Sequence, residues 1–453
     1  MGAHRRRPQS PFVPDRARSR HILALALPIM GAMASQSLLN LVDAIMVGTL
    51  GGKPLAAVGL GGYVTFVAIS LVLGLGAGVQ AMVARRKGEG AREVYAVPLN
   101  AGLVLGAALS LPLMALFSGI AGPLLRVLTG DEAVRELAEP YLLVRVLGVL
   151  AIALNFSFRG YWNGISRPGV YLRTLVTVHI ANVVLSYGLI FGHFGLPRLE
   201  TLGAAIGTTT ALYLGSLLYF LQTWKHGRRH GFLARLPEAR TLVNIVRVSL
   251  PNSIQQLLFS LGLMVLFWIL GRIGTDEVAV GHVLITLILF LILPAVGLGL
   301  SASSLVGQAL GRGETEDAYH WGWDVTRLAV LLLLIMALPM WLVPELVLGL
   351  FLHDEALVEL GRVPLMITGV AICLDGIAIV FTHALLGAGA ARSVMAVSLS
   401  VQWFFFLPLA YIIGPVLGYG LAGVWLLQAL QRLVISCLLG RLWVRRHWAR
   451  IEL

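Results

Sequence analysis

The sequence predicts an all-α, polytopic membrane protein with twelve transmembrane helices in two six-helix lobes. Hydrophobic residues make up 58% of the 453 residues and charged residues only 12%, whereas soluble domains usually carry about 25% charged residues. The chain also divides into apolar segments of about 20 residues or more, the length that crosses a bilayer as a helix. Finally, the two halves of the chain resemble each other at one fixed offset.

The predicted spans are separated by charged or Pro/Gly-rich breaks, with a basic linker between the two sets of six. They cover residues 21–48, 55–83, 94–118, 135–160, 168–192, 202–224, 242–271, 276–307, 317–341, 357–386, 393–413 and 420–442. The first apolar run is too long for the core of a signal peptide, so we expect it to be retained as a span. The expected parts of the chain are a basic N-terminal tail (1–20), an N-lobe (21–224), a linker (225–241), a C-lobe (242–442) and a C-terminal tail (443–453).

Basic residues gather in the segments that twelve spans place on the same side as the termini. The positive-inside rule therefore predicts that both termini are cytoplasmic, and we expect the chain to lie in the cytoplasmic (inner) membrane. These residues also account for most of the net charge of +12 and can meet anionic lipid, so we expect the lipid bilayer as a partner and no nucleic acid. They include Arg5, Arg6, Arg7, Arg85, Arg86, Lys87, Arg167, Arg228, Arg229, Arg312, Arg392, Arg445 and Arg446.

The internal repeat has an offset of 223 residues, since Pro28 aligns with Pro251 (251 − 28 = 223). Because this shift spans six helices, an even number, the two repeats have the same orientation and should be related by an axis along the membrane normal. Repeated halves of this kind usually hold a substrate site at or beside their interface. The same shift pairs Gly48 with Gly271, Gly74 with Gly297, Gly76 with Gly299 and Gly164 with Gly387.

An acidic residue, Asp43, lies within the first apolar segment. Because a charge at the centre of a membrane helix costs about 2.5–3.5 kcal/mol even on the insertion scale, such a residue is a functional hypothesis by default. Gln36 and Asn40 lie on the same helical face as Asp43, and Pro28 can bend the helix as a hinge. The alternative is that Asp43 only hydrogen-bonds a neighbouring helix as part of the packing.

A second polar face is predicted on the helix at 168–192, where His179, Asn182 and Ser186 are spaced by three and four residues. The amide of Asn182 could hydrogen-bond Asp43 or offer its oxygen to a cation. Thr208 adds a hydroxyl on the next helix, although threonines often bond back to their own helix.

The second half has its own acid at a different position. The residue equivalent to Asp43 is Leu266, whereas Asp375 lies in the span at 357–386. His383 follows on the same helix, where a neutral imidazole hydrogen-bonded between helices is the favoured interpretation, although histidine can titrate in the working range. Further polar candidates are Asn155, Gln255 and Gln256.

Catalytic and metal-binding patterns are not apparent in the sequence. We find no pairing of a nucleophile with a base, no cluster of metal ligands and no phosphate-binding loop, and the two cysteines, Cys373 and Cys437, lie in apolar runs without metal-ligand spacing. We therefore expect no enzyme and no cofactor, and no metal ion other than a transported cation.

Several longer motifs carry a resemblance to a known family. They are "DAIMVGTLGGKPLAAVGL", "GISRPG", "NVVLSYGLIFGHFGLPRLETLGAAIGT", "LPNSIQQ" and "LLGAGAAR". Together with the repeat, they make the sequence resemble the multidrug and toxic compound extrusion (MATE) transporters over nearly its whole length, closest to the DinF-like branch with some NorM-like features. The resemblance implies a V of two lobes that opens outward, and export of amphiphilic, often cationic, compounds driven by inward flow of protons or Na⁺.

The resemblance also implies where the ions bind. Asp43 with Asn182 is similar to the N-lobe proton or cation site of the DinF-like branch, in which a further acid commonly stands where this chain has Ser186. Asp375 is similar to the acid of the NorM-like branch, whose expected glutamate on the seventh helix is replaced by Phe259. We therefore expect ion coupling by Asp43, Asn182, Ser186, Thr208 and Asp375, with a proton or Na⁺ at Asp43 and Asn182.

The expected substrate site combines apolar walls with a few polar groups, which suits loose recognition of many ligands. We expect a monomer that exports amphiphilic or cationic small molecules. The alternative is a lipid-linked oligosaccharide or lipid flippase of the same superfamily, but such flippases tend to line their cavity with several basic residues, whereas here acids and amides are expected. The expected substrate-binding residues are Met33, Gln36, Asn40 and Asn155 from one lobe, and Gln255, Gln256 and His383 from the other.

Overall fold

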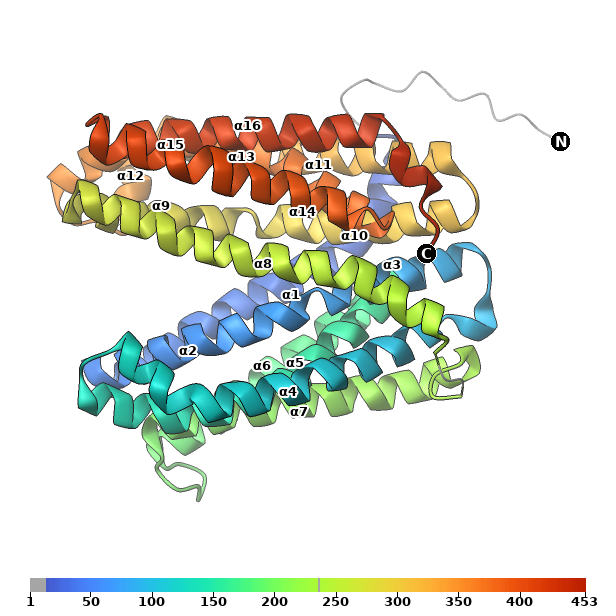
Figure 1. The fold of residues 1–453 in the computed structure, drawn as a ribbon, viewed down its shortest axis with the longest axis horizontal. Coiled ribbons are helices and arrows are strands. Elements are labelled where there is room, and N and C mark those ends of the chain that lie inside the picture. The colour runs from blue at the N-terminus through green and yellow to red at the C-terminus, as the bar shows by residue number, and fades with distance from the viewer. Residues whose placement is uncertain (1–13, 235–236) are drawn as a thin grey trace. The chain divides into compact units, whose positions relative to one another are not determined.

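The computed structural model describes residues 14–234 and 237–453, and within these ranges every regular element is a helix (Figure 1). Arg5, Arg6 and Arg7 of the predicted tail lie outside the described residues. In the first half the membrane helices are α1 (Arg16–Gly48), α2 (Gly52–Leu73), α3 (Leu75–Gly88), α4 (Val97–Leu128), α5 (Glu132–Gly164), α6 (Pro168–Phe191) and α7 (Glu200–Gly227), with short 3₁₀ turns η1 (Arg92–Val94) and η2 (Arg228–His230).

The second half repeats this arrangement and ends in a more irregular pair of helices. Its elements are α8 (Ala239–Ile273), α9 (Thr275–Leu291), α10 (Leu293–Gly311), α11 (Thr315–Leu342), the short α12 (Pro344–Gly349), α13 (Glu355–Gly387), α14 (Ala391–Leu399), η3 (Ser400–Phe406), α15 (Leu407–Tyr411), η4 (Ile412–Val416), α16 (Gly420–Val444) and η5 (His447–Arg450). Of these, η3 and η4 are π-helical.

Twelve spans in the described part of the chain are long and apolar enough to cross a membrane. The predicted number and order of spans are therefore confirmed. The pairs α2–α3 and α9–α10 each form one span, and the segment from Ala391 to Val416 forms another. The first span begins at Arg16, so the last five residues of the predicted tail at 1–20 are helical.

By their contacts, the described residues form two compact units whose boundaries fall inside helices. Unit 1 contains the described residues up to Met30 together with Leu258–Glu452, and unit 2 contains Gly31–Leu257. The first half of α1 thus belongs to the unit built mainly from the second half of the chain, and the first half of α8 belongs to the other unit. This division differs from the expected lobes, 21–224 and 242–442, in α1 and α8.

In unit 2, small residues allow the first half of α8 to approach α2 and α3 closely. A Cβ built on Gly74 would lie only 2.0 Å from the backbone oxygen of Ser249, so no side chain fits there. The backbone N–H of Gly74 donates to Oγ of Ser253 at 3.1 Å. The bend between α2 and α3 is therefore fixed by contact with α8.

In unit 1 the equivalent residues make an equivalent contact. A Cβ on Gly297 would lie 2.5 Å from Cγ of Met30 in the first half of α1. The 223-residue shift pairs Gly297 with Gly74, and it pairs Met30 with Ser253. The repeat in the sequence is therefore also a repeat of helix crossings.

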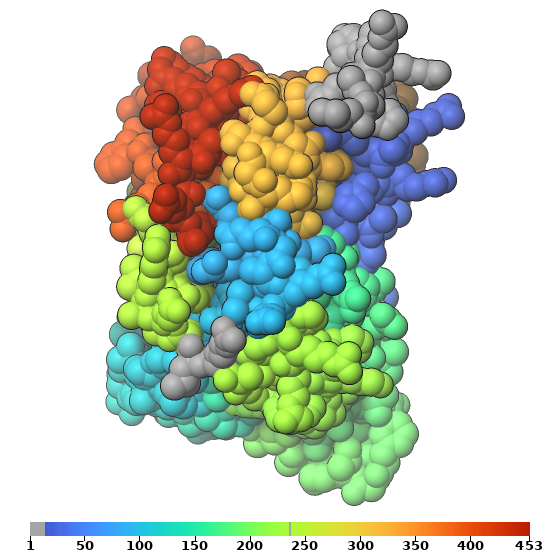
Figure 2. Space-filling view, turned by 90° about the vertical axis from the view of Figure 1, so that its right-hand side faces the viewer, coloured from blue at the N-terminus to red at the C-terminus, as the bar shows by residue number. Residues whose placement is uncertain are grey.

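The end of the chain packs against the start of α11 within unit 1. The Trp443 ring stacks on that of Tyr319, with 6.3 Å between their centroids, and on that of Trp448 at 4.2 Å. Arg446 forms a hydrogen-bonded ion pair with Glu316. The hydrogen bond to Glu316 raises the pKa of Arg446 above its usual value. In Figure 2 the red C-terminal residues lie against the yellow-orange segment that contains the start of α11.

Candidate functional site

Asp43 lies half-buried on α1 where this helix packs against α5. Its neighbour Val42 packs against the same core cluster as Val144 of α5, and Arg145 is close enough to Asp43 to interact with it electrostatically. Within the described part of the chain, Oδ1 of Asp43 and both Nε and Nη1 of Arg145 are buried without a hydrogen-bond partner. Buried polar atoms are normally hydrogen-bonded, so these three atoms depart from the usual pattern of helix packing.

A chain of hydrogen bonds connects α1 to α6 two turns before Asp43. Nε2 of the buried His179 lies 3.1 Å from Oε1 of Gln36, and Gln36 Nε2 donates to Oδ1 of Asn40 at 3.1 Å. Because an amide oxygen can only accept, Nε2 carries the proton, and in the neutral ring Nδ1 accepts from the Ser35 hydroxyl at 2.7 Å. The polar faces predicted on the two helices therefore meet through His179 and Gln36.

Asn182 and Ser186, both buried on α6, bond to each other. Ser186 Oγ donates to Asn182 Oδ1 at 3.2 Å, which engages one of the two lone pairs of the amide oxygen. A Cβ on Gly207 of α7 would lie 2.5 Å from Ser186 Oγ, which shows that α6 and α7 approach closely here. Thr208 donates to the backbone oxygen of Ala204 at 2.9 Å, the common bond of a threonine to its own helix.

The remaining expected substrate residues of the first half differ in their exposure. Met33 is half-buried, whereas Gln36 and Asn40 are exposed. Asn155 donates to the backbone oxygen of Leu212 at 3.0 Å and accepts from Ser216 at 2.9 Å, so its amide connects α5 to α7. Gln255 and Gln256, expected from the second lobe, belong by their contacts to unit 2. The reason is that the first half of α8 packs against α2 and α3.

In unit 1, Asp375 of α13 forms a buried ion pair with Arg432 of α16. Arg432 Nε lies 3.2 Å from Asp375 Oδ1, and the two side chains are 20% and 6% exposed. Ser436, one turn after Arg432, donates to the backbone oxygen of Leu374 at 2.8 Å and so fixes the crossing of the two helices. Asp375 therefore has a counter-charge supplied by the protein itself.

Phe259 stands where the NorM-like branch is expected to carry a glutamate, and in unit 1 its backbone accepts a hydrogen bond from Gln402. Gln402 lies in the π-helical η3, a conformation that is frequent at functional sites, and its Nε2 donates to the backbone oxygen of Phe259 at 3.4 Å. His383 Nδ1 donates to the backbone oxygen of Ile379 at 2.9 Å. This bond stays within α13 and is not the bond between helices that was expected for His383.

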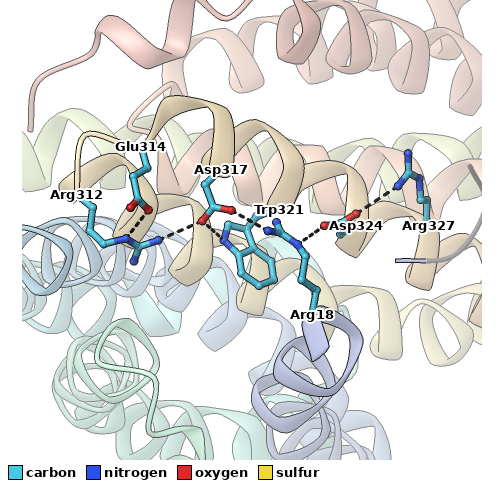
Figure 3. A network of polar contacts seen from close by, with 7 residues as sticks. All are labelled: Arg18, Arg312, Glu314, Asp317, Trp321, Asp324 and Arg327. Carbon is cyan, nitrogen blue, oxygen red and sulfur yellow. Dashed lines mark hydrogen bonds and ion pairs between the residues drawn. The ribbon is translucent and has the colours of Figure 1, made fainter. Parts of the chain in front are cut away.

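A polar network in unit 1 surrounds Arg18, at the start of α1 (Figure 3). Its Nη1 lies 2.7 Å from Asp317 Oδ1 and its Nε 2.5 Å from Asp324 Oδ2, both on α11. The guanidinium also lies 3.6 Å from the ring centroid of Trp321. Arg312 and Arg327 pair with the same two acids. These contacts anchor the start of α1 on unit 1 beside a cavity of about 370 Å³, which is lined by Ala17, Arg18, His21, Leu305, Gln308, Arg312 and Trp321.

Two of these charged residues, Arg145 and Arg432, were missed by the sequence analysis. Each is an arginine within a predicted span, and an ionisable residue inside the membrane is a functional hypothesis whatever its sign. Considering basic residues together with acids would therefore have found both, but not which acid each arginine faces.

The fold and these buried charges define a class, that of polytopic α-helical membrane proteins built from two repeated six-helix halves, as in secondary transporters. Comparison with known proteins identifies the family. The MatE family profile matches residues 28–188 and 251–412, and the two matched segments begin at Pro28 and Pro251, the residues that define the repeat. The chain therefore belongs to the MATE family of multidrug efflux transporters.

Individual relatives agree with this assignment. The chain is 28% identical over 413 residues to a probable multidrug resistance protein NorM from Agrobacterium fabrum, covering 89% of this chain and 88% of that protein. It is 29% identical over 434 residues to the multidrug resistance protein NorM from Burkholderia vietnamiensis, covering 90% of each. Both relatives thus match along nearly the whole chain.

Solved structures confirm the fold. A crystal structure of MATE in the straight conformation superimposes with a TM-score of 0.86 at 26% identity, covering 95% of this chain and 96% of the other. An outward-facing multidrug resistance MATE transporter of the MOP superfamily gives a TM-score of 0.86 at 24% identity, covering 96% and 97%. At such identity the second match establishes the fold only.

Proposed function

We propose that this MATE transporter is a cation-coupled antiporter that exports amphiphilic, cationic compounds across the cytoplasmic membrane. The observation that carries the proposal is the carboxylate of Asp43, whose Oδ1 is buried without a hydrogen-bond partner among the described residues. A carboxylate that only served packing would be hydrogen-bonded to a neighbouring helix. Relatives that are named for multidrug resistance support export as the direction of transport.

Asp43 can serve coupling because its two charge states favour different arrangements of α1. When ionised it is attracted to Arg145 on α5; when neutralised by a proton or Na⁺ it loses that attraction, and α1 is free to bend at Pro28. An ion that binds one arrangement better shifts the population toward it, which is what coupling requires. In this proposal an entering ion also meets the polar groups of Asn182, Ser186 and Thr208.

Substrate binding in this proposal depends on apolar area with a few polar groups, as expected for a transporter of many ligands. Met33, Gln36 and Asn40 follow one another along α1 before Asp43, so a bound cation would lie within reach of the coupling acid. We propose that the protein acts as a monomer.

The test of coupling is Asp43→Asn, which keeps size and hydrogen bonding but cannot ionise. Purified protein in liposomes should export ethidium when a proton or Na⁺ gradient is imposed, and Asp43→Asn should lose this export while inserting normally. Asp131→Asn, at an exposed acid between α4 and α5, is the matched control and should retain it. If Asp43→Asn exports ethidium at the wild-type rate, Asp43 is packing and the mechanism is wrong.

Orientation is part of the proposal and has its own test. We place both termini in the cytoplasm because the basic residues concentrate on that side. A cysteine introduced at Arg229, in a background lacking Cys373 and Cys437, should resist an impermeant thiol reagent applied to intact cells and react after lysis. Ready labelling of intact cells contradicts this topology.

A further inference from the structure

The cavity of about 370 Å³ in unit 1 lies where α1 and α11 begin. Its walls carry the guanidinium groups of Arg18 and Arg312 together with the imidazole of His21. The carboxylates that pair with these arginines are not among the residues that line it. Sites for small ligands have volumes of about 300–1,000 Å³, so the cavity is large enough for a small anion or for the polar head of a larger molecule.

The acids of α11 hold both guanidinium groups in fixed orientations (Figure 3). Asp317 lies 2.7 Å from Nη1 of Arg18 and 3.2 Å from Nη2 of Arg312. The ring of Trp321 covers Arg18, with 3.6 Å from the guanidinium carbon to the ring centroid, whereas 40% of the Arg312 side chain remains exposed. Because these donors are already ordered, a ligand that binds them loses less free energy in ordering side chains.

The basic cluster departs from the internal repeat. At the shift of 223 residues Arg312 corresponds to Glu89, although the glycines on both sides of it are repeated. Arg18 corresponds to Thr241. The helix crossings that the two halves share do not require these arginines, since the first half lacks them. Their presence in one half therefore needs an explanation of its own.

Apolar surface continues from the cavity along both helices. α1 and α11 belong to the first and ninth spans, so they run in the same direction from the cavity, and they share a core cluster that contains Ile22 and Val325. Tryptophan is typical of the membrane–water interface, and basic pockets between membrane helices bind the headgroups of anionic lipids. The exposed residues further along the two helices include Leu23, Leu27, Leu331 and Ile335.

We propose that this cavity binds the phosphate headgroup of an anionic phospholipid, with Arg18 and Arg312 as its ligands and Trp321 at the membrane interface. The inference goes beyond transport and does not depend on the role of Asp43. A guanidinium matches the geometry of phosphate oxygens, and the exposed apolar residues offer a surface for acyl chains that a free phosphate ion would not use. A lipid bound there bridges the start of α1 and the end of α10.

The test measures, by native mass spectrometry, the affinity of the purified full-length protein in an uncharged detergent for its first bound lipid. The probes are dioleoylphosphatidylglycerol and dioleoylphosphatidylcholine, which share acyl chains and phosphate but differ in net charge. Wild type should bind phosphatidylglycerol about tenfold or more tighter than phosphatidylcholine, and Arg312→Gln should lose about tenfold of its affinity for phosphatidylglycerol. Arg392→Gln, at an exposed position at the start of α14, is the matched control and should bind as wild type.

A second variant tests the cavity without changing a charge. Ala17→Trp fills the cavity and should also weaken binding of phosphatidylglycerol, whereas inorganic phosphate in excess should not displace the lipid. Equal wild-type affinity for the two lipids, or an equal loss in Arg392→Gln, overturns the site in favour of general surface charge. Wild-type affinity in Ala17→Trp places the lipid outside the cavity and overturns it too. Displacement by inorganic phosphate identifies a free-anion site and overturns the assignment to a lipid.

Discussion

The buried ion pair between Asp375 and Arg432 allows a quantitative prediction for Arg432→Met. At 3.2 Å, two unit charges attract each other by about 5 kcal/mol at an effective dielectric constant of about 20. Methionine fills similar space without charge, so the substitution leaves a carboxylate whose side chain is only 6% exposed without its partner. Removing one member of a buried pair costs about 3–5 kcal/mol.

The penalty has an upper limit because Asp375 can take up a proton. Protonating a carboxyl with an ordinary pKa of about 3.9 costs about 4 kcal/mol at pH 7 and about 1.5 kcal/mol at pH 5. The free energy of unfolding should therefore fall by about 3–4 kcal/mol at pH 7 and by no more than about 1.5 kcal/mol at pH 5. The loss is smaller at pH 5 because protonating Asp375 costs less free energy at the lower pH.

The assay is unfolding of the purified protein in mixed micelles by titration with SDS, followed by tryptophan fluorescence at both pH values. Arg441→Met, at an exposed position on the same helix, is the matched control and should change stability by no more than about 0.5 kcal/mol. Asp375→Asn combined with Arg432→Met removes both charges and should recover most of the loss. A loss below about 1 kcal/mol at pH 7, or an equal loss at both pH values, would refute this reasoning.

Three further predictions concern other contacts. Arg18→Met removes two ion pairs and leaves the buried Asp324 to Arg327 alone; it should cost about 1.5–3 kcal/mol of unfolding free energy, whereas the exposed Arg20→Met should not. Gly207→Leu should destabilise by about 1–3 kcal/mol, because a Cβ there would lie 2.5 Å from a serine hydroxyl on α6, and thermal unfolding in detergent measures this loss. Backbone N–H groups at the start of α5 lower the pKa of Asp131, so its stabilisation is fully present above about pH 4 and declines as the pH falls toward the lowered pKa. The stability difference between wild type and Asp131→Asn, measured from pH 7 to pH 3, should therefore shrink at the acid end.

Much of the polar site could be anticipated from helical periodicity. The spacing of Gln36, Asn40 and Asp43 on one helix, and of His179, Asn182 and Ser186 on another, predicts two polar faces. The structure joins these faces through Gln36 and His179. The possible bond of Asn182 to Asp43 is not seen among the described residues, where Asp43 Oδ1 has no hydrogen-bond partner and the Asn182 oxygen accepts from Ser186 on its own helix. Periodicity predicts which residues share one face of a helix. It does not predict how deep the helix lies in the membrane or how it is rotated against a neighbouring helix.

The sequence by itself determined the number of spans, their order and the repeat. Span length and hydropathy are properties of each segment alone, because every backbone polar group in a membrane helix is satisfied within that helix. The glycines that repeat at the 223-residue shift lie at equivalent helix crossings in both halves. For example, Gly74 contacts α8 and the equivalent Gly297 contacts α1.

Only the tertiary structure decided which charges meet and which unit each half-helix joins. Arg432 binds Asp375 and Arg145 acts on Asp43 across separate helices, and such interactions depend on the relative height and rotation of helices far apart in the chain. The halves of α1 and α8 are each continuous in sequence, with no composition break at Met30 or Leu257. Their assignment follows from side-chain packing against other helices, which is a property of the assembled fold and not of any single segment.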